Sequence, residues 1–513
     1  MPLTDQLRLM AGAHPDEVAY GVLAGGELTF GDWEAEASSL ARGLGALGVS
    51  RSERVAIGLA TTEALRWLVA YAGIHKAGAV VVPLNPRLSD REITTMLHHA
   101  GASCAIVSGE LLERMWTMAP QLLDLRLVVD AGGAEPASRP APTTPGPQVV
   151  AWADLLDADR TPYQVEVSED DLADILYTSG TTGAPKGVAV RHRSASLLPV
   201  NLPRWTGERW LHASPLFTFA GISFIYNPMK LGMSGLYQPR FEVDPWLDAV
   251  EHYRPTAVFL VPSMAQLLVT HERFEKADLS SVKLCAIGSA PLAPGTLRRL
   301  QDRMPEAAVS NSYGMTEAGA AYCAMPKGEA VKRVGSVGKP MAPMEVRCVD
   351  EAGREVAAGE VGEVLIRMPG REREYFRDPE ATSRTWAGGW LHTGDLGRLD
   401  DDGYLYIVGR RKEVIIRGGN NVHAADVESV ILEHPMVAEA AVIGVPHEVL
   451  GEDLVAFVVP VPSGQISEVE LRDHCLEHLA DYKSPRRFIL VGELPRNATG
   501  KVMKHLLVVP PAG

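Results

Sequence analysis

The residues of this chain whose types and spacing best suit chemistry form a run of small, hydroxyl-bearing residues and glycines around one lysine. The run, YTSGTTGAPKGV, extends from Tyr177 to Val188. Glycine lets the backbone approach a ligand closely, and Ser and Thr hydroxyls can surround an anion together with backbone N–H groups. Lys186 adds a compact positive charge. The run therefore predicts a phosphate-binding loop.

Two common nucleotide-binding patterns do not describe this chain. The run differs from G-x-x-x-x-G-K-[ST] because Lys186 is followed by Gly187, its spacing from Gly180 is wrong, and no Ser or Thr follows to hold magnesium. A second stretch, GLGALG from Gly43 to Gly48, fits G-x-G-x-x-G. A dinucleotide site needs that pattern to follow a strand and open a helix, whereas here it closes a helical pattern. We therefore interpret these glycines as the end of a helix.

Composition limits the class of protein. The chain has 513 residues, 46% of them hydrophobic and 22% charged, and a formal net charge of −15. This length predicts two or more domains. The acidic balance argues against general nucleic-acid binding. The five cysteines are scattered without C-x-x-C spacing, which indicates neither a zinc site nor a disulfide framework. With no evident signal peptide and no apolar stretch of ~18 residues, we expect a cytoplasmic protein without a membrane span.

The elements that must position the loop alternate between helical and strand patterns. FGDWEAEASSLARGLGALG and LRWLVAYAGIHKAG repeat apolar residues at helical spacing, while RVAIGLA, AVVVPLN, ADILYTSG, AVFLVPSM and VKLCAIGSAPL are short apolar strands. This alternation predicts parallel sheets covered by helices. AGGAEPASRPAPTTPGPQ predicts a surface loop. Short strands with Gly and Asp turns over 345–408 predict a small β-barrel or sheet. Helical and apolar strand patterns from Arg410 onward predict a compact final α/β unit.

Further motifs occur in a fixed order on both sides of the loop. They are IHKAGAVVVPLNPRLS before it, and IGSAPL, NSYGMTEAG, LHTGDLGRLDDDGYLYIVGRRKEVIIRGGNNV and LPRNATGKV after it. This ordered set resembles the class I adenylate-forming superfamily, which includes acyl- and aryl-CoA synthetases, peptide-synthetase adenylation domains and firefly luciferase. The resemblance spans nearly the whole chain. It implies a large N-terminal domain of two α/β sheet subdomains plus a small β-barrel, residues 1–409, and a small mobile C-terminal α/β domain, residues 410–513, with a hinge near 410–412.

The resemblance also implies a reaction and its site. A carboxylate would attack the α-phosphate of ATP, pyrophosphate would leave, and the acyl group would pass from AMP to a thiol. Glu317 would bind Mg²⁺, the ring of Tyr313 would stack on adenine, and Lys501 would contact both the carboxylate and the α-phosphate, where a cation offsets their repulsion. Catalytic roles are implied for Lys501, Lys186, Thr178 and Glu317. The implied nucleotide-binding residues are Thr178, Ser179, Gly180, Thr181, Thr182, Gly183, Lys186, Gly288, Ser289, Ala290, Asn311, Tyr313, Gly314, Thr316, Asp395, Arg410 and Lys501.

The stretch SPLFTFAGISFIY indicates what kind of acid is bound. Amino-acid-activating relatives have an Asp here for the α-amino group, and this chain has none, so an apolar acid without an amine is favoured. The expected acyl pocket contains Phe217, Thr218, Phe219, Ile222, Gly288 and Gly314, with Phe224 and Tyr226 adding aromatic lining. The chain departs from the family pattern at three positions, Thr218 in place of His, Ala424 in place of Pro, and Glu374 in place of Gly.

In relatives the C-terminal domain rotates between the two half-reactions. The resemblance makes Lys412 the hinge residue and places Gly418 and Gly419 along a narrow tunnel for the pantetheine arm of CoA. We expect the substrates to be ATP, Mg²⁺, CoA and a small carboxylic acid. The alternative is a stand-alone adenylation enzyme that loads an acyl or aryl acid onto the phosphopantetheine of a separate carrier protein. An oxidoreductase built on GLGALG and a non-catalytic acyl-nucleotide sensor are the remaining hypotheses.

Overall fold

The computed structural model describes residues 1–132, 146–178, 186–195, 203–290, 292–320, 323–461, 464, 466–497 and 501–510. Residues 179–185 of the expected phosphate loop lie outside this part of the chain, as do residues 133–145 of the expected surface loop. Predictions that concern Ser179, Gly180, Thr181, Thr182 and Gly183 are therefore not addressed by the structure.

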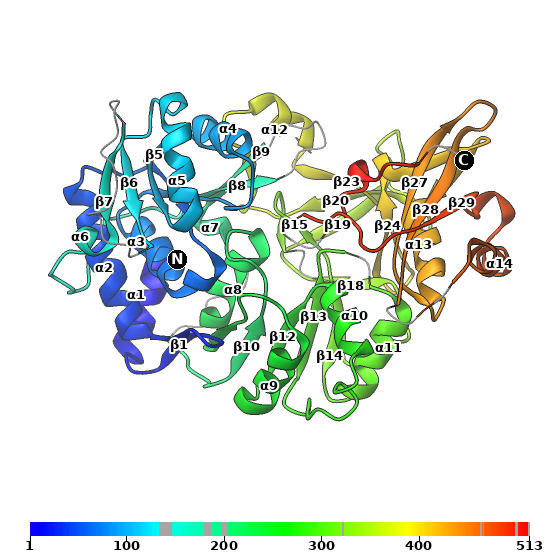
Figure 1. The fold of residues 1–513 in the computed structure, drawn as a ribbon, viewed down its shortest axis with the longest axis horizontal. Coiled ribbons are helices and arrows are strands. Elements are labelled where there is room, and N and C mark those ends of the chain that lie inside the picture. Colours follow the sequence, from blue (N-terminus) through cyan, green and yellow to red (C-terminus); the bar gives the residue numbers. More distant parts are fainter. Residues whose placement is uncertain are drawn as a thin grey trace.

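Two large sheets make up most of the N-terminal part, as Figure 1 shows. In both sheets most neighbouring strands are parallel, which confirms the alternation of strand and helix expected from the sequence. The first has the order β21-β9-β8-β4-β3-β5-β6-β7, with β21 Glu374–Tyr375, β9 Lys186–Arg191, β8 Leu172–Thr178, β4 Val80–Pro83, β3 Arg54–Gly58, β5 Ala102–Val107, β6 Leu127–Asp130 and β7 Gln148–Ala151. The second has the order β14-β13-β12-β10-β11-β1-β2, with β14 Ala308–Ser312, β13 Leu284–Gly288, β12 Ala257–Leu260, β10 Arg209–His212, β11 Ser234–Tyr237, β1 Val18–Val22 and β2 Gly26–Thr29.

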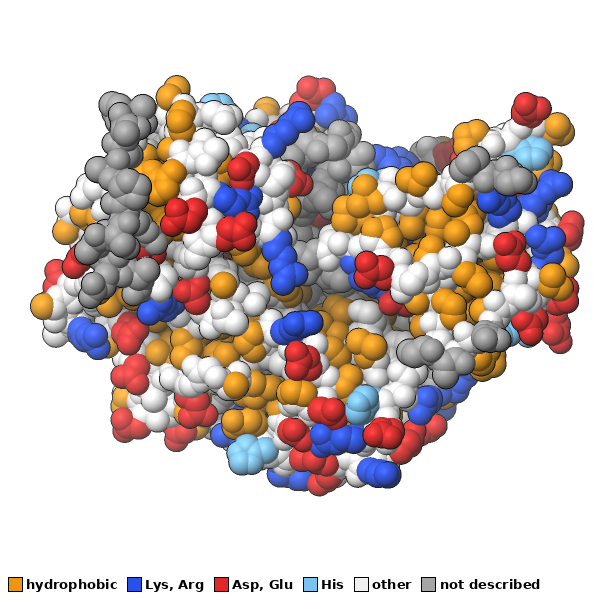
Figure 2. All heavy atoms as spheres, in the orientation of Figure 1, with side chains coloured by type: hydrophobic (Ala, Val, Ile, Leu, Met, Phe, Trp, Pro, Cys, Tyr) orange, Lys and Arg blue, Asp and Glu red, His pale blue; other side chains and the backbone are white. Residues whose placement is uncertain are grey.

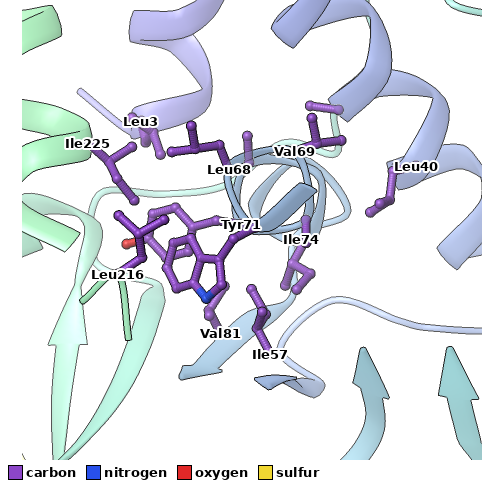
Figure 3. Packing of buried hydrophobic residues seen from close by; sticks show 14 of the residues in the cluster. Leu3, Leu40, Ile57, Leu68, Val69, Tyr71, Ile74, Val81, Leu216 and Ile225 are labelled. Atoms are coloured by element: carbon purple, nitrogen blue, oxygen red, sulfur yellow. The ribbon is translucent and has the colours of Figure 1, made fainter. Parts of the chain in front are cut away.

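Helices cover these sheets and one of them joins the two. Every residue of α3 except Leu65 and Arg66 is buried, and Figure 3 shows its side chains packed with Ile57 and Val81 of the first sheet and with neighbouring helices. The same core cluster includes Tyr20 and Tyr237 of the second sheet. Burial on all sides explains why this helix is apolar around its whole circumference. The helices of this part are α1 Leu3–Ala13, α2 Phe30–Ala46, α3 Ala64–Lys76, α4 Asp90–Ala100, α5 Gly109–Met118, α6 Trp152–Leu155, α7 His192–Ala195, α8 Phe219–Lys230, α9 Val243–Tyr253, α10 Pro262–Thr270 and α11 Pro294–Arg303.

The prediction for the GLGALG stretch is confirmed. Helix α2 ends at Ala46 and Gly48 has a φ of 77°, the left-handed conformation that glycine adopts after a helix. The stretch therefore closes a helix and does not open one.

A third, antiparallel sheet follows in the region where a small barrel or sheet was expected. Its order is β17-β18-β24-β23-β20-β19, with β22 beside β23, and no pairing among the described residues joins the two edge strands. The strands are β17 Cys323–Ala324, β18 Ser336–Pro340, β19 Glu345–Val349, β20 Gly362–Arg367, β22 Trp386–Ala387, β23 Trp390–Leu399 and β24 Leu405–Arg410. Helix α12, Pro379–Thr385, precedes β22, and a short hairpin of β15, Gly314–Met315, and β16, Gly319–Ala320, lies before the sheet.

The C-terminal part is a compact α/β unit at one end of the molecule (Figure 1). Its sheet has the order β26-β25-β28-β27 with β29 beside β28, and its two helices bury Val427, Ile431 and Leu471 against that sheet. Its elements are β25 Val414–Arg417, β26 Asn420–His423, α13 Ala424–Glu433, β27 Val437–His447, β28 Gly451–Pro460, α14 Glu468–His478 and β29 Arg487–Leu490. None of the helices in the described part of the chain is long and apolar enough to cross a membrane. On the face shown in Figure 2, acidic and basic side chains are interspersed.

Candidate active site

The carboxyl ends of parallel strands β13 and β14 bring two of the expected nucleotide motifs together. Ile287 pairs with Asn311 and Gly288 pairs with Ser312, so the segments that follow each strand start side by side. Ligands of open α/β sheets bind at such strand ends. A Cβ on Gly288 would lie 3.2 Å from the ring of Phe259 and 3.3 Å from the Ser312 carbonyl oxygen, which explains the glycine at this position.

A buried carboxylate lies at the edge of this region. Asp395 is 4% exposed, Tyr313 Oη donates a hydrogen bond to its Oδ2, and Arg410 Nε lies 3.1 Å from its Oδ1. The geometry follows from the fold, because Asp395 and Arg410 are register partners on strands β23 and β24. Burial and the charge of Asp395 raise the pKa of Tyr313, so its phenol keeps its proton. A ring, a carboxylate and a guanidinium therefore converge at one place.

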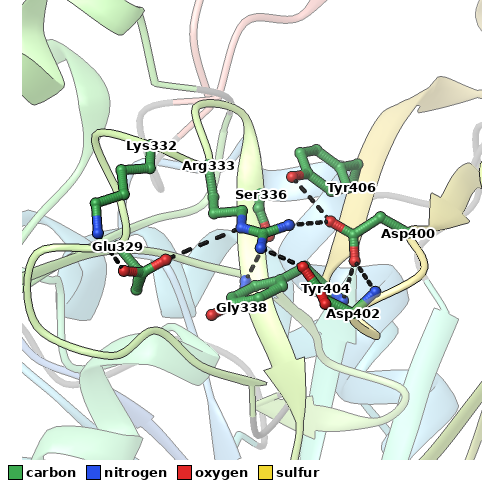
Figure 4. A network of polar contacts seen from close by, with 9 residues as sticks. All are labelled: Glu329, Lys332, Arg333, Ser336, Gly338, Asp400, Asp402, Tyr404 and Tyr406. Carbon is green, nitrogen blue, oxygen red and sulfur yellow. Dashed lines mark hydrogen bonds and ion pairs between the residues drawn. The ribbon is translucent and has the colours of Figure 1, made fainter.

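Ion pairs hold the β23–β24 hairpin to the segment that follows the Glu317 motif. Figure 4 shows Arg333 between Asp400 and Asp402, and the Asp400 pair measures 2.8 Å. Tyr406 Oη also donates to Asp400 Oδ2, at 3.3 Å. This network fixes the hairpin that carries Asp395.

A second group of side chains forms around Glu317. Tyr375 Oη donates to Glu317 Oε1 at 3.1 Å, and Lys186 Nζ lies over the Tyr375 ring, 4.8 Å from its centroid. Strand β21 carries Tyr375 alongside β9, where Tyr375 pairs with Val188, and the adjacent β8 places Thr178 opposite Lys186. The two ends of the expected phosphate loop and the expected metal ligand are thus joined through Tyr375, a residue that the sequence analysis did not identify.

Arg373 is a second residue that the sequence analysis missed. It is 4% exposed, its Nη1 donates to the Thr316 carbonyl oxygen, and its Nη2 donates to the Ser194 carbonyl oxygen at 2.6 Å. Its guanidinium also lies 5.2 Å from the centroid of the Phe219 ring. Burial lowers the pKa of Arg373 to about 10, against the opposing charges of Asp174 and Glu317, so the group is charged at neutral pH. Arg373 therefore links the Thr316–Glu317 turn to the end of α7.

Lys501 lies within electrostatic reach of Asp395 and Arg410. Burial lowers its pKa and the neighbouring Arg410 lowers it further, whereas Glu413 and Asp395 act in the opposite direction. Its backbone is fixed by two bonds with Asn497, from Lys501 N to Asn497 Oδ1 and from Asn497 N to Lys501 O, each 2.9 Å. A lysine from the C-terminal part is thus within electrostatic reach of Asp395 and Arg410 on strands β23 and β24.

The expected acyl-pocket residues divide between a helix start and the protein core. Thr218 is the N-cap of α8, where its Oγ1 accepts from Gly221 N at 3.0 Å and donates to Pro215 O at 2.7 Å. Its hydroxyl therefore stabilises a helix terminus. Ile222 is 3% exposed in the main core. Phe217 and Phe219 are half-buried, Phe224 is 5% exposed, and Tyr226 is 1% exposed with its Oη 2.6 Å from that of Tyr71. The pocket-lining roles of these residues and of Gly314 stay predictions.

The expected tunnel and hinge residues lie in the C-terminal part. Gly418 and Gly419 form the turn between β25 and β26, with φ values of 57° and 82°, and a Cβ on Gly419 would meet nothing within 4 Å. Lys412 lies in a short 3₁₀ turn, Arg411–Glu413, directly after β24. The departure at Glu374 has a local explanation, because Glu374 Oε1 lies 2.7 Å from Arg191 Nη2 on the neighbouring strand.

The described residues suit a magnesium ion that is held mainly by substrate. No group of three or more His, Cys, Asp and Glu side chains able to hold a metal occurs in the part of the chain that the structure describes. Magnesium commonly takes one or two carboxylates together with phosphate oxygens and water. Glu317, half-buried beside Tyr375, fits such a single-carboxylate site.

Comparison with known families gives a consistent match. A model of the AMP-binding enzyme family matches residues 7–376, and a model of the AMP-binding enzyme C-terminal domain matches residues 426–501. The chain is 35% identical to a feruloyl-CoA synthase of Amycolatopsis sp over 503 residues, 97% of this chain and 96% of the relative. It is 32% identical to a 2-succinylbenzoate–CoA ligase of Bacillus licheniformis over 511 residues, 98% of each chain.

Solved structures agree with this match. The crystal structure of an anthranilate CoA ligase in complex with anthranoyl-AMP superposes with a TM-score of 0.86 at 27% identity, covering 98% of this chain and 96% of that one. The o-succinylbenzoate CoA synthetase of Bacillus subtilis, in complex with its acyl-adenylate intermediate, superposes with a TM-score of 0.83 at 28% identity, covering 100% and 99%.

Proposed function

The chain belongs to the family of AMP-binding enzymes, and from this premise we propose that it is an AMP-forming ligase that joins an apolar carboxylic acid to the thiol of CoA. A carboxylate oxygen attacks the α-phosphorus of ATP, and pyrophosphate leaves. The CoA thiol then attacks the carbonyl carbon of the acyl-AMP, the thiol proton passes to solvent, and AMP leaves as the thioester forms.

The observation that supports this proposal best is the convergence around Asp395. Its carboxylate is oriented by Tyr313 and Arg410, and the charges of Asp395 and Arg410 both act on Lys501. In the proposed reaction Asp395 accepts hydrogen bonds from the ribose hydroxyls, Arg410 donates to the same sugar, and the ring of Tyr313 stacks on adenine. Lys501 then neutralises the charge that develops between carboxylate and α-phosphate.

The group around Glu317 handles the leaving group in this proposal. Lys186 and Thr178 flank residues 179–185, which would hold the β- and γ-phosphates. Glu317 would bind Mg²⁺, and the ion would neutralise phosphate charge. The hydroxyl of Thr316 would donate to the phosphates, while Tyr375 keeps Glu317 and Lys186 at a fixed separation.

The second half-reaction needs a different arrangement of the C-terminal part. We propose that rotation about Lys412 withdraws Lys501 and brings Gly418 and Gly419 to the acyl-AMP. The open surroundings of Gly419 support this role, since the turn leaves space for a narrow pantetheine arm. CoA is favoured as acceptor because the compared relatives named above are CoA synthases and ligases. A carrier protein as acceptor is the alternative.

The proposed acid is aryl or aliphatic and has no α-amino group. The half-buried Phe217 and Phe219 offer apolar surface, and the stretch SPLFTFAGISFIY has no carboxylate for an ammonium group. The relatives act, by name, on feruloyl and succinylbenzoate groups, which favours an aryl acid.

A pyrophosphate-release screen over aryl and aliphatic acids, with and without CoA, tests this proposal. We expect pyrophosphate release that requires both ATP and an acid. We expect continued release of AMP only when CoA is present. Continued release of AMP only in the presence of a phosphopantetheinylated carrier protein would favour the carrier protein as acceptor. Cleavage of ATP to ADP and phosphate without any acid would contradict the adenylation reaction.

A further inference from the structure

A set of buried polar side chains lies on the sheet face that α8 covers. Trp210 and His212 on β10 and Tyr237 on β11 share this face, since both β10 side chains contact the Phe224 ring of α8 and His212 also contacts Tyr237. Tyr20 on β1 reaches the same place across Gly235, where a Cβ would lie 2.2 Å from the Tyr20 ring. The glycine thus makes room for a tyrosine that hydrogen-bonds His212, with Tyr20 Oη 2.5 Å from His212 Nε2.

Three polar atoms in this set have no hydrogen-bond partner in the described part of the chain. Trp210 Nε1, His212 Nδ1 and Tyr237 Oη are buried and make no hydrogen bond with any residue that the structure describes. Their side chains belong to residues that are 8%, 0% and 0% exposed. Leaving one buried polar atom unpaired costs about 1–3 kcal/mol, so three on one sheet face favour a group that the described residues do not supply.

The hydrogen-bond pattern defines the chemistry of the missing group. Burial lowers the pKa of His212 to about 3 and raises that of Tyr20, so both rings are neutral. With the Tyr20 hydroxyl as the donor to Nε2, the proton of the neutral imidazole resides on Nδ1. The unpaired atoms are therefore an imidazole N–H, an indole N–H and a phenol O–H, which together favour a hydrogen-bond acceptor.

The set adjoins the expected acyl pocket. Phe224 contacts His212 at 4.6 Å and Phe259 at 4.8 Å between ring centroids, and the Phe259 ring borders Gly288. Gly288 is on β13 and His212 on β10, two strands away on the same sheet. With two strand spacings of about 4.8 Å and an offset of two residues, the backbones lie roughly 12 Å apart.

We propose that His212, Tyr237 and Trp210 form a specificity site for an acceptor oxygen at the end of the acid remote from its reacting carboxylate. The inference rests on the proposed function, because it takes Gly288 to border the acyl pocket of that reaction. The separation of roughly 12 Å between the two backbones leaves room for an acid of one aromatic ring with a two-carbon arm and an oxygen substituent.

The test compares two acids of nearly equal shape. The wild-type enzyme is assayed for pyrophosphate release with 4-hydroxycinnamic acid and with 4-methylcinnamic acid, which replaces the distal oxygen by a methyl group. We expect kcat/KM to be about tenfold higher for the hydroxy acid, the effect of one net hydrogen bond. His212→Leu should bring the ratio close to one. Tyr237→Phe, which keeps the ring, should reduce the ratio about threefold, while Tyr482→Phe, at a residue 40% exposed, should leave it unchanged.

The outcomes separate this inference from the proposed function. Equal kcat/KM for the two acids in the wild-type enzyme would overturn the specificity site and leave the ligase reaction intact. A preference that survives in both His212→Leu and Tyr237→Phe would also overturn it, since the preference would then arise elsewhere. Absence of acid-dependent pyrophosphate release with every acid tested, apolar acids included, would overturn the proposed function as well.

Discussion

Replacing the buried guanidinium of Arg373 by an apolar side chain should destabilise the protein and weaken catalysis together. Arg373→Met removes the donors to the carbonyl oxygens of Thr316 and Ser194. Each bond from a charged donor contributes about 1.5–3 kcal/mol, so the free energy of unfolding should fall by about 3–6 kcal/mol. Arg373→Lys, which can reach one carbonyl oxygen at a time, should lose about half as much.

The same change should affect the magnesium–ATP step, because Arg373 holds the turn that carries Glu317. Displacement of a positioned group by about 1 Å can reduce a rate by about 10²-fold. We therefore expect kcat/KM for magnesium–ATP to fall at least tenfold in acid-dependent pyrophosphate exchange. Urea unfolding followed by circular dichroism measures the stability. Arg240→Met is the matched control, since the Arg240 side chain is 88% exposed and its loss should change stability by at most about 0.5 kcal/mol.

Two results would contradict the proposed role of Arg373. If Arg373→Met unfolds at the same urea concentration as the wild type and as Arg240→Met, the two carbonyl contacts contribute nothing measurable. If stability falls but kcat/KM for magnesium–ATP is unchanged, Arg373 stabilises the fold without positioning the Thr316–Glu317 turn.

Three further predictions concern the proposed roles. Asp395→Asn should raise the KM for ATP about tenfold or more, because the ribose and the guanidinium both lose an ionised acceptor; an unchanged KM would place the ribose elsewhere. Glu317→Gln should raise the magnesium concentration needed for half-maximal pyrophosphate exchange, measured by titration at saturating ATP, and an unaltered requirement would remove Glu317 as a ligand. Lys501→Ala should lower the rate of adenylation by about 10²–10³-fold yet still convert supplied acyl-AMP to thioester, whereas Gly419→Leu should do the reverse. Gly353→Leu, at an exposed turn with a φ of 76°, controls for backbone strain. Equal loss of both activities in Lys501→Ala and Gly419→Leu would contradict the two-conformation mechanism.

The fold followed from local patterns that a sequence displays directly. RVAIGLA and AVVVPLN became β3 and β4, and the helical pattern between them became α3, since periodicity and apolar content agree in these segments. The end of α2 at Ala46 followed from its glycines in the same way. Thr218 shows a missed local signal, because a Thr directly before a helical pattern is typical of an N-cap.

The contacts that organise the site could not be predicted in this way. Tyr375 meets Glu317 because β21 pairs with β9, and Arg373 reaches α7 through the same strand addition. Such pairings join residues far apart in the chain, and no periodicity encodes them. His212 and Tyr20 are likewise brought together only by the order β10-β11-β1.

The fate of the carboxylate oxygen tests the central claim most directly. The enzyme is incubated with ATP, magnesium, CoA and an acid labelled with ¹⁸O in its carboxylate, and the products are analysed by mass spectrometry. Attack of the carboxylate on the α-phosphorus predicts one ¹⁸O atom in the AMP released and none in the pyrophosphate. Unlabelled AMP, or label in inorganic phosphate formed together with ADP, would contradict an acyl-AMP intermediate.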